Sequence, residues 1–245
     1  IRHVDAANNA IYFYNATQNY GFYRTLGHPP NPGSGKGHLD HARSITLGAP
    51  VPHPQKSFAV GLNYQAHADE GGMEVPKAPL VFTKFPSCLV GPTATVEMRS
   101  DFCDYEGELV VVIGKGGKDI APGDAWNHVV GLTIGQDISD RVAQFVAKPP
   151  HFDLGKSFDT FGPTGPFLVS PDEVPDRNDL RITCAVNDEV LQDASTTGMI
   201  FDIPTLISYL SHITTLVTVG TAKSDATSRM RLAIVARVDA VRNIA

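Results

Sequence analysis

The sequence predicts an α+β fold that is mostly β, and two observations predict it. Short runs of β-branched and apolar residues alternate with clusters of Gly, Pro and Asp along most of the chain, which is the pattern of strands and turns. Helical periodicity appears in few places, so we expect more strand than helix. The 245 residues, 42% of them apolar, suffice for one large domain, or for one domain with a small appendage.

The first 50 residues differ in composition from the rest. Residues 8–23 are rich in Asn and Tyr, and residues 29–37 form a loop of Pro, Gly and Ser. We therefore expect residues 1–50 to form a small N-terminal appendage with weakly specified strands, and residues 51–245 to form the catalytic domain.

Strands in the main body are expected where β-branched or apolar runs are bounded by turn residues. These runs are residues 58–61, 80–84, 95–98, 107–113, 128–138, 165–169, 180–186 and 233–238. Residues 186–190 are expected to form a hairpin turn, with Asn187 and Asp188 at its centre.

Helices are expected at three places only. Residues 64–70 form a short polar turn or helix, and residues 141–147 form a helix that ends before Pro149. Residues 201–211 have the apolar spacing of an amphipathic helix, with Asp202 near its start.

Composition and charge exclude several classes of protein. The formal net charge is −6, so a nucleic-acid surface is not expected. A membrane span needs about 20 consecutive apolar residues, and the sequence has no such stretch. The three cysteines are widely spaced and include no Cys-x-x-Cys pair, so we expect buried thiols and not a disulfide framework or a zinc–thiolate site.

Glu106 and Glu108 stand two residues apart at the entry to a very apolar run. Residues two apart in a strand point to the same face, so the two carboxylates are expected side by side. Like charges at that distance repel, and a cation between them would relieve the repulsion. The alternative interpretation is that both glutamates are solvated on an exposed edge.

A third acid follows a second apolar run. Residues 131–137 alternate in polarity and end in Asp137, which a buried strand would deliver at its far end. Three carboxylates without His or Cys suit a hard cation such as Mg²⁺ or Mn²⁺. An octahedral ion held in this way would keep about three positions for water or a chelating substrate.

Several segments together resemble the fumarylacetoacetate hydrolase family, whose small members include acylpyruvate hydrolases and oxaloacetate decarboxylases. The resemblance covers about residues 58–221. The segments that carry it are Gly61-Leu62-Asn63-Tyr64-Gln65-Ala66-His67-Ala68-Asp69-Glu70, Asp104-Tyr105-Glu106-Gly107-Glu108, Gly135-Gln136-Asp137-Ile138-Ser139-Asp140-Arg141, Gly155-Lys156-Ser157-Phe158-Asp159-Thr160-Phe161-Gly162-Pro163 and Met199-Ile200-Phe201-Asp202. The resemblance implies a mixed β-roll with few helices and a homodimer.

The resemblance also implies roles for individual residues. Glu106, Glu108 and Asp137 match the metal ligands, and Lys156 matches an active-site lysine. His67 and Glu70 match a dyad that assembles when a lid closes. The positions that match substrate-binding residues are Tyr64, Arg141, Gln144 and Thr221.

Each of these roles has a plainer alternative. Arg141 suits bidentate binding of a carboxylate, but it could instead form a structural ion pair with Asp140 or another neighbour. Lys156 could stabilise oxyanion charge or be an ordinary exposed lysine. His67 could be a general base whose imidazole Glu70 orients, or the two could form a surface ion pair.

The function expected first is metal-dependent hydrolysis of a C–C bond in an acylpyruvate-type 1,3-diketo acid. In that mechanism the substrate chelates the metal, His67 with Glu70 activates water, and Lys156 stabilises the oxyanion. The alternatives are decarboxylation of a β-keto acid such as oxaloacetate, then isomerisation or tautomerisation, then keto-acid binding without catalysis. No terminal targeting signal is visible, so the expected compartment is the cytoplasm or the mitochondrial matrix.

Overall fold

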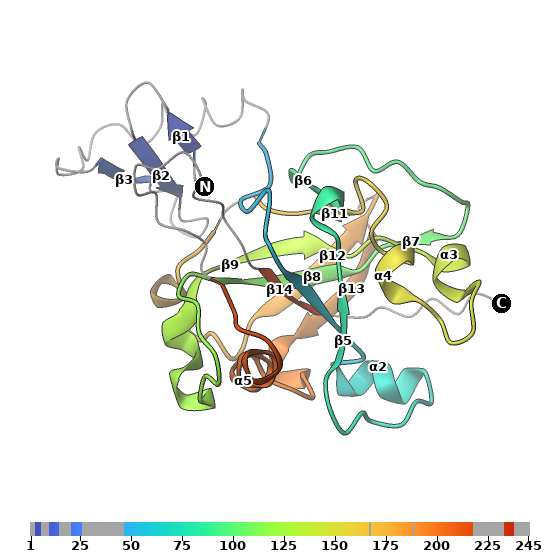
Figure 1. The fold of residues 1–245 in the computed structure, drawn as a ribbon. Coiled ribbons are helices and arrows are strands. Elements are labelled where there is room, and N and C mark those ends of the chain that lie inside the picture. Colours follow the sequence, from blue (N-terminus) through green and yellow to red (C-terminus); the bar gives the residue numbers. More distant parts are fainter. Residues whose placement is uncertain are drawn as a thin grey trace.

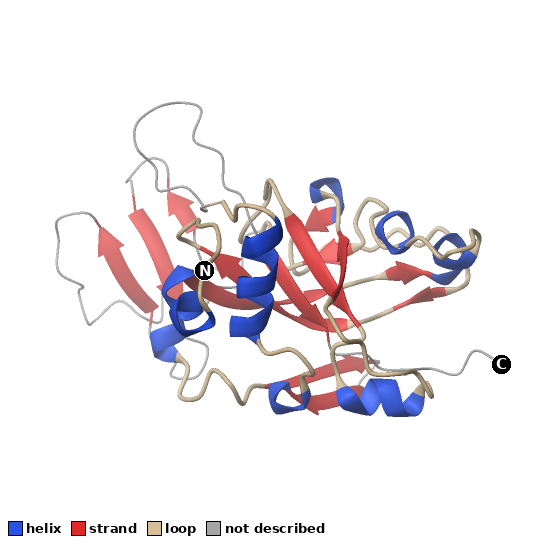
Figure 2. Ribbon diagram, turned by 60° about the horizontal axis from the view of Figure 1, so that its bottom comes forward, coloured by secondary structure: helices blue, strands red, loops and turns tan. Residues whose placement is uncertain are grey.

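The structure of the chain is a computed structural model. It describes residues 47–217 apart from 167 and 188, together with the backbone of four further strands. These strands are β1 (His3–Asp5), β2 (Ala10–Tyr14), β3 (Gly21–Thr25) and β14 (Ala233–Arg237). The described residues form an α+β fold with more strand than helix, as predicted (Figures 1 and 2).

A five-stranded mixed sheet forms the centre of the fold, in the order β5-β4-β14-β8-β9 (Figure 1). Strands β4 and β14 are parallel, and the other neighbours are antiparallel. The remaining bounds are β4 (Ser57–Gly61), β5 (Leu80–Thr83), β8 (Gly107–Ile113) and β9 (Val129–Gln136). These strands confirm the expected runs within a residue or two.

Strand β8 is buried along its whole length because both faces of the sheet are covered. Leu109, Val111 and Ile113 belong to a core cluster that includes residues of helix α5 (Ile203–Ile213). Val110 and Val112 face the other way and pack with Phe82 in a second cluster. A strand covered on both faces reads as a continuous apolar run, which is what the sequence of β8 shows.

Helix α5 is confirmed, although it begins and ends two residues later than the predicted range 201–211. The side chain of Asp202 accepts a hydrogen bond from the backbone N–H of Thr205, so it caps the helix N-terminus. The inner face of the helix carries its apolar spacing, namely Ile203, Leu206, Ile207 and Leu210.

The predicted hairpin joins β12 (Arg181–Val186) to β13 (Glu189–Ser195). Val186 pairs with Glu189, so two residues form the loop. Asn187 has a φ of +50°, a left-handed conformation that Asn tolerates better than most residues. The other central residue, Asp188, lies outside the described residues.

The remaining elements are short. The helices are α2 (Gln65–Glu70), α3 (Arg141–Phe145), α4 (Phe152–Gly155) and the 3₁₀ turns η1 (Pro86–Cys88), η2 (Pro122–His128), η3 (Pro171–Glu173) and η4 (Thr196–Gly198). The strands are β6 (Leu89–Val90), β7 (Cys103–Asp104), β10 (Ser139–Asp140) and β11 (Gly162–Pro163). Helix α4 was not predicted, because four residues give too little periodicity to detect.

Two predicted strands are wrong. Residues 95–98 form an extended loop whose Glu97 backbone N–H donates to the Thr160 hydroxyl instead of a neighbouring strand. Among the described residues of 165–169, Val169 forms a bridge with Leu132 on β9, and none belongs to a strand. Proline at position 166 lacks the N–H that a ladder needs, so this run cannot continue the sheet.

Strands β1, β2 and β3 form a separate antiparallel sheet in the first 25 residues. The appendage and the boundary near residue 50 stay an expectation. No helix within the described ranges is long and apolar enough to cross a membrane.

Candidate metal centre

Three carboxylates meet where β8 begins and β9 ends. Glu106 directly precedes β8, Glu108 is its second residue, and Asp137 directly follows β9. The antiparallel register pairs Gly107 with Gln136, and the backbone N–H of Asp137 donates to the carbonyl of Glu106 at 2.8 Å. The strand pairing therefore brings the three acids together although about 30 residues separate them in the chain.

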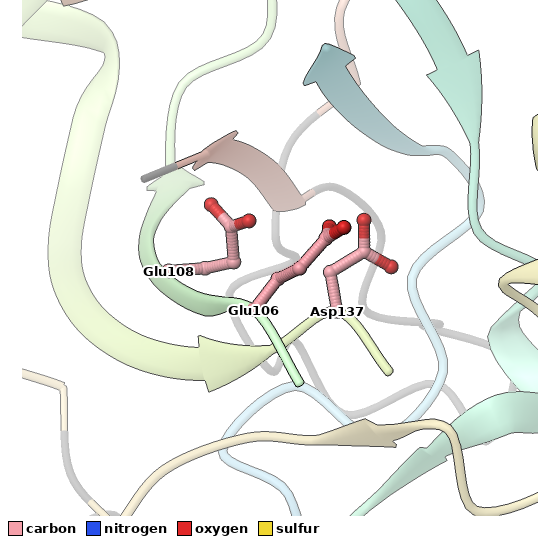
Figure 3. Close-up of side chains that lie close together, drawn as sticks. All are labelled: Glu106, Glu108 and Asp137. Carbon is pink, nitrogen blue, oxygen red and sulfur yellow. The ribbon is translucent and has the colours of Figure 1, made fainter. Parts of the chain in front are cut away.

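One ligand atom from each of these carboxylates lies within 4.8 Å of the other two. Figure 3 shows all three side chains rising from the same side of the strands. Each side chain is at most 1% exposed, so the alternative of two glutamates solvated on an edge is wrong.

The arrangement fits a small divalent cation. An octahedral ion with metal–oxygen bonds of about 2.1 Å holds its ligands about 3 to 4.2 Å apart, close to the observed spacing. The donors are all hard carboxylate oxygens, which suits Mg²⁺ or Mn²⁺ better than a soft metal. Glu106, Glu108 and Asp137 could thus hold such an ion.

Lys156 lies inside this cluster. Its ammonium group donates to Glu106 Oε2 at 2.6 Å, to Asp137 Oδ2 at 3.0 Å and to Ser139 Oγ at 2.6 Å. The side chain is completely buried, so the alternative of an ordinary exposed lysine is wrong. Helix α4 ends at Gly155 and delivers Lys156 directly to the carboxylates.

A second buried lysine was missed by the sequence analysis. Lys84 directly follows β5, and its ammonium group donates to Asp137 Oδ1 at 2.6 Å and to the main-chain carbonyl of Lys156. Burial is the largest single influence on the pKa of Lys84 and lowers it, but the charges of Asp137, Cys88 and Glu106 and the hydrogen bond to Asp137 together outweigh burial, so the net direction is upward. Strand alternation could have identified Lys84 as buried, because residues two apart share a face and Phe82 is buried.

Arg141 is engaged with the protein's own acids. It donates from Nε and Nη2 to Asp104 Oδ2, from Nη2 to Glu106 Oε1 at 2.8 Å, and from Nη1 to Gln144 Oε1. A guanidinium has five N–H donors, and these contacts use four of them. The remaining N–H is on Nη1, so neither edge of the guanidinium offers the two N–H groups that bidentate binding of a carboxylate needs. Burial lowers the pKa of Arg141, and the charges of Glu106 and Asp104 outweigh burial and raise it.

Tyr64 lies at the start of the expected lid, directly before α2. Its side chain is 4% exposed, and its hydroxyl has no hydrogen-bond partner among the residues that the structure describes. Burial raises the pKa of the phenol, and the charge of Glu108 raises it further. Tyr64 is therefore neutral at physiological pH.

Asn63 ties this segment to the loop before α5. Its side-chain amide donates to the carbonyl of Phe201 at 2.9 Å, and its side-chain oxygen accepts from the N–H of Phe201 at 2.8 Å. Asn63 is fully buried. The N-terminal end of the lid segment is thus fixed, whereas Gly71 and Gly72 at its other end are exposed.

The two residues of the expected dyad, His67 and Glu70, lie in different environments. His67 is buried within α2, but Glu70 at the end of the helix is exposed. Whether the two side chains act as a dyad stays a prediction.

Gln144 is 2% exposed and accepts the hydrogen bond from Arg141. A side chain at Gly155 would lie 2.7 Å from the backbone N of Gln144, so helices α3 and α4 touch through their backbones. This contact places Arg141 and Gln144 close to Lys156. Thr221 lies outside the described residues.

A buried glutamine supports the segment between the two glutamates. The side-chain oxygen of Gln192 on β13 accepts from the backbone N–H of Gly107 at 2.8 Å. The hairpin β12–β13 therefore holds the peptide that joins Glu106 to Glu108. Sequence reasoning missed Gln192, since nothing in its local pattern marks it.

Comparison with known proteins decides the family. The family model described as fumarylacetoacetate (FAA) hydrolase C-terminal matches residues 56–238. This chain belongs to the fumarylacetoacetate hydrolase family. The resemblance carried by the sequence motifs is confirmed, and the described fold is that of its solved members.

Among curated members of the fumarylacetoacetate hydrolase family, the mitochondrial oxaloacetate tautomerases FAHD2A of Bos taurus and Homo sapiens are each 44% identical to this chain. The matches span 174 and 173 residues, which are 70% of this chain and 55% of each relative. This chain thus spans about half the length of these relatives.

Two solved structures carry other activities in their names. The 5-carboxymethyl-2-hydroxymuconate delta-isomerase of Mycobacterium smegmatis is 26% identical, with a TM-score of 0.71 over 94% of this chain and 84% of its own. The fumarylacetoacetate hydrolase of Exiguobacterium antarcticum is 33% identical, with a TM-score of 0.65 over 78% of this chain and 64% of its own. The family therefore includes hydrolases, isomerases and tautomerases.

Proposed function

We propose that this chain is a divalent-metal enzyme that interconverts the enol and keto forms of a small keto acid of the oxaloacetate type. The observation that carries the metal-dependent part is the buried cluster of Glu106, Glu108 and Asp137. The choice of reaction is supported by the 44% identity to relatives named oxaloacetate tautomerases.

In this proposal Glu106, Glu108 and Asp137 would hold Mg²⁺ or Mn²⁺. When bound, the ion supplies Lewis-acid polarisation of the carbonyl oxygen of a chelating keto acid. In the keto-to-enol direction one proton leaves carbon and another is added to oxygen, and in the enol-to-keto direction one proton leaves oxygen and another is added to carbon. No water molecule needs to be activated for attack on carbon.

The chain's own residues are proposed to position the substrate and move the protons. The three N–H donors of Lys156 already contact Glu106, Asp137 and Ser139, so Lys156 would stabilise negative charge on the substrate oxygen through its own charge. His67, buried in the lid helix, would carry a proton, because imidazole titrates near neutral pH. The neutral hydroxyl of Tyr64, without a partner among the described residues, would donate to a substrate oxygen. Gln144 and Thr221 would complete substrate binding.

The part played by Arg141 is narrower than a bidentate clamp. Four of its N–H donors contact Asp104, Glu106 and Gln144, so only a single hydrogen bond to a substrate carboxylate is available. This matches the structural alternative of an ion pair with neighbouring acids, although the partners are Asp104 and Glu106, not Asp140.

Hydrolysis of a C–C bond, which the sequence analysis ranks first, is the second candidate. The solved fumarylacetoacetate hydrolase relative supports it. It needs an activated water, for which His67 and Glu70 would have to meet. Because Glu70 is exposed whereas His67 is buried, and because the 44% identical relatives are named tautomerases, we place hydrolysis after tautomerisation.

One experiment separates the candidates. Oxaloacetate is incubated in D₂O with Mg²⁺ or Mn²⁺, and proton NMR follows the loss of the C3 proton signal above the uncatalysed rate. A tautomerase accelerates this exchange without releasing CO₂, whereas a decarboxylase produces pyruvate and CO₂. Acetylpyruvate incubated in parallel releases acetate only if the enzyme hydrolyses C–C bonds.

His67 and Glu70 provide a matched pair of variants for the same assay. His67→Ala should lower the exchange rate at least tenfold, and Glu70→Ala should lower it much less. Equal losses in both variants would favour the dyad and hence hydrolysis. A protein that binds metal and keto acid but catalyses none of these reactions would be a binding protein.

We also propose a homodimer. The outer face of α3 and α4 exposes Val142, Phe145, Val146 and Leu154, each more than half accessible. Exposed apolar side chains gathered on two helices in contact with each other commonly mark a protein interface. Sedimentation equilibrium of the wild type and of Val146→Asp tests this, since a charge in the patch should shift the equilibrium to monomer.

A mitochondrial compartment is proposed ahead of the cytoplasm, because the tautomerase relatives carry that word in their names. The cysteines Cys88, Cys103 and Cys184 are free thiols, which suits either reducing compartment. Fractionation of cells of the source organism tests the proposal.

A further inference from the structure

Lys84 contacts two residues of the candidate site, Asp137 and Lys156, from the far side of the central sheet. It follows β5, an edge strand of the central sheet, whereas Glu106, Glu108 and Asp137 lie near the opposite edge at β8 and β9. Its side chain is 2% exposed although it carries a charge. Burying an ammonium group is unfavourable unless it is paired and hydrogen-bonded, so its partners account for its position.

Those partners are two. The Lys84 ammonium group donates to Asp137 Oδ1 at 2.6 Å and to the main-chain carbonyl oxygen of Lys156. One cation thus contacts both a carboxylate of the candidate metal centre and the backbone of the residue whose side chain enters that centre.

The two lysines hold different oxygens of Asp137. Lys84 contacts Oδ1, and Lys156 contacts Oδ2 at 3.0 Å. Lys156 also reaches Glu106, so it lies between two of the three acids. Lys84 contacts no other acid by a hydrogen bond among the described residues, so its effect on the acids falls on the orientation of Asp137.

We propose that Lys84 is a positioning residue, which fixes the carboxylate of Asp137 for metal binding and the backbone of Lys156 for catalysis. The proposal rests on the metal-dependent function proposed above. It assigns Lys84 no contact with the substrate or the reacting atoms.

Removing Lys84 has two effects of opposite sign on metal affinity. The loss of a nearby positive charge would favour binding of a cation. The loss of the hydrogen bond to Oδ1 would let the Asp137 carboxylate turn away, which weakens binding. Substitution of residues that orient metal ligands typically costs about 10- to 100-fold in affinity, so we expect the second effect to dominate.

The test is isothermal titration of Mn²⁺ into the wild type, Lys84→Met and Lys77→Met. Methionine is an unbranched side chain one atom shorter than lysine and lacks its charge and donors, and Lys77 is an exposed lysine that serves as the control. We expect the dissociation constant to rise at least tenfold in Lys84→Met and to stay unchanged in Lys77→Met. An unchanged or lower value in Lys84→Met would overturn the proposal.

Turnover at saturating Mn²⁺ adds a second readout. The carbonyl of Lys156 loses its donor in Lys84→Met, so kcat should stay reduced when every site is filled with metal, while KM changes less. If saturating Mn²⁺ restores kcat fully, the proposed effect of Lys84 on the backbone of Lys156 is contradicted. Lys84→Gln, which keeps an N–H donor, is measured as well and replaces Lys84→Met if that variant does not fold.

A metal-free measurement separates failure of this proposal from failure of the proposed function. In chelator, the unfolding midpoints of Lys84→Met, Asp137→Asn and the double variant should be clearly non-additive, because the two side chains are in contact. Additive effects would show that the side chains of Lys84 and Asp137 do not interact. A wild type that binds no Mn²⁺ would overturn the metal-dependent function, and with it the role of Lys84 in metal binding.

Discussion

Lys156 and Glu106 form an ion pair of 2.6 Å in which both side chains are completely buried. Lys156 also pairs with Asp137 at 3.0 Å, so one ammonium group separates two carboxylates that would otherwise repel each other. The pair makes the stability of the candidate site depend on a cation, whether that cation is a lysine or a metal ion.

Lys156→Met should therefore destabilise the metal-free protein strongly. Removing one partner of a buried ion pair commonly costs about 3–5 kcal/mol, and we expect the lower end of that range because Glu106 keeps Arg141 and Asp137 keeps Lys84 as partners. Added Mn²⁺ should stabilise this variant more than it stabilises the wild type, since the ion takes over the neutralisation of Glu106 and Asp137. Denaturant unfolding with EDTA and with MnCl₂ measures both effects. Equal metal stabilisation in the two proteins would contradict this prediction.

Gly155→Ala should destabilise the protein and lower its activity. The new methyl group would lie 2.7 Å from the backbone N and 2.8 Å from the Cα of Gln144, so helices α3 and α4 would have to separate. Overpacking of this kind costs about 1–3 kcal/mol. Gly123→Ala is the matched control, because nothing lies within 4 Å of a side chain added there. Urea unfolding compares the two, and similar losses would show that the backbone contact has no special importance.

Asn63→Ala should free the N-terminal end of the lid segment. It removes both hydrogen bonds to Phe201 and leaves a backbone N–H and carbonyl without their partner. Each buried group left unsatisfied costs about 1–3 kcal/mol. Gln65→Ala removes an exposed hydrogen bond to Asp69 from the same segment and should have little effect. Hydrogen exchange of residues 64–70 measures the opening directly, and unchanged protection in Asn63→Ala would contradict this role.

Tyr64 should make the protein less stable at alkaline pH. Burial raises the pKa of its phenol in the folded state, and Glu108 adds to the rise. Below the unfolded pKa of about 10 the phenol is protonated in both the folded and the unfolded state, so its contribution to the free energy of unfolding is fully present. As the pH rises above that value the unfolded state loses its proton first, so stability falls by up to about 1.4 kcal/mol per pH unit until the folded pKa is reached.

The test is urea unfolding of the wild type and Tyr64→Phe between about pH 9 and 11, a range around the ordinary phenol pKa. The variant should show a shallower fall in unfolding free energy. A remaining fall is expected from Lys84, whose pKa is raised in the folded state and whose contribution is also lost at high pH. Identical slopes in the two proteins would show that the phenol does not titrate differently in the folded state.

Local patterns predicted the parts of the site that lie on regular elements. The apolar run of β8 and its two glutamates were recognisable because alternation fixes which side chains share a face. Asp137 was recognisable because a second apolar run ends there. Helix α5 was predicted from its spacing and from Asp202 at its N-terminus.

Contacts between distant segments could not be predicted in the same way. Lys84 and Gln192 contact the site through pairings that depend on how β5 and the hairpin β12–β13 pack, and neither residue has a distinctive neighbour in the chain. The engagement of Arg141 by Asp104 and Glu106 is likewise a property of the assembled cluster. The predicted strand at residues 95–98 failed because alternation alone does not supply a neighbouring strand.

The order of strands in the central sheet has a consequence for synthesis of the protein. Val235 on β14 pairs with Ala59 on one side and with Val110 on the other, so a late segment lies between two early ones. While the ribosome is still translating, β4 and β8 lack this middle partner, and their unpaired edges are open to wrong association. Chaperone dependence during expression should therefore fall sharply once β14 has been made.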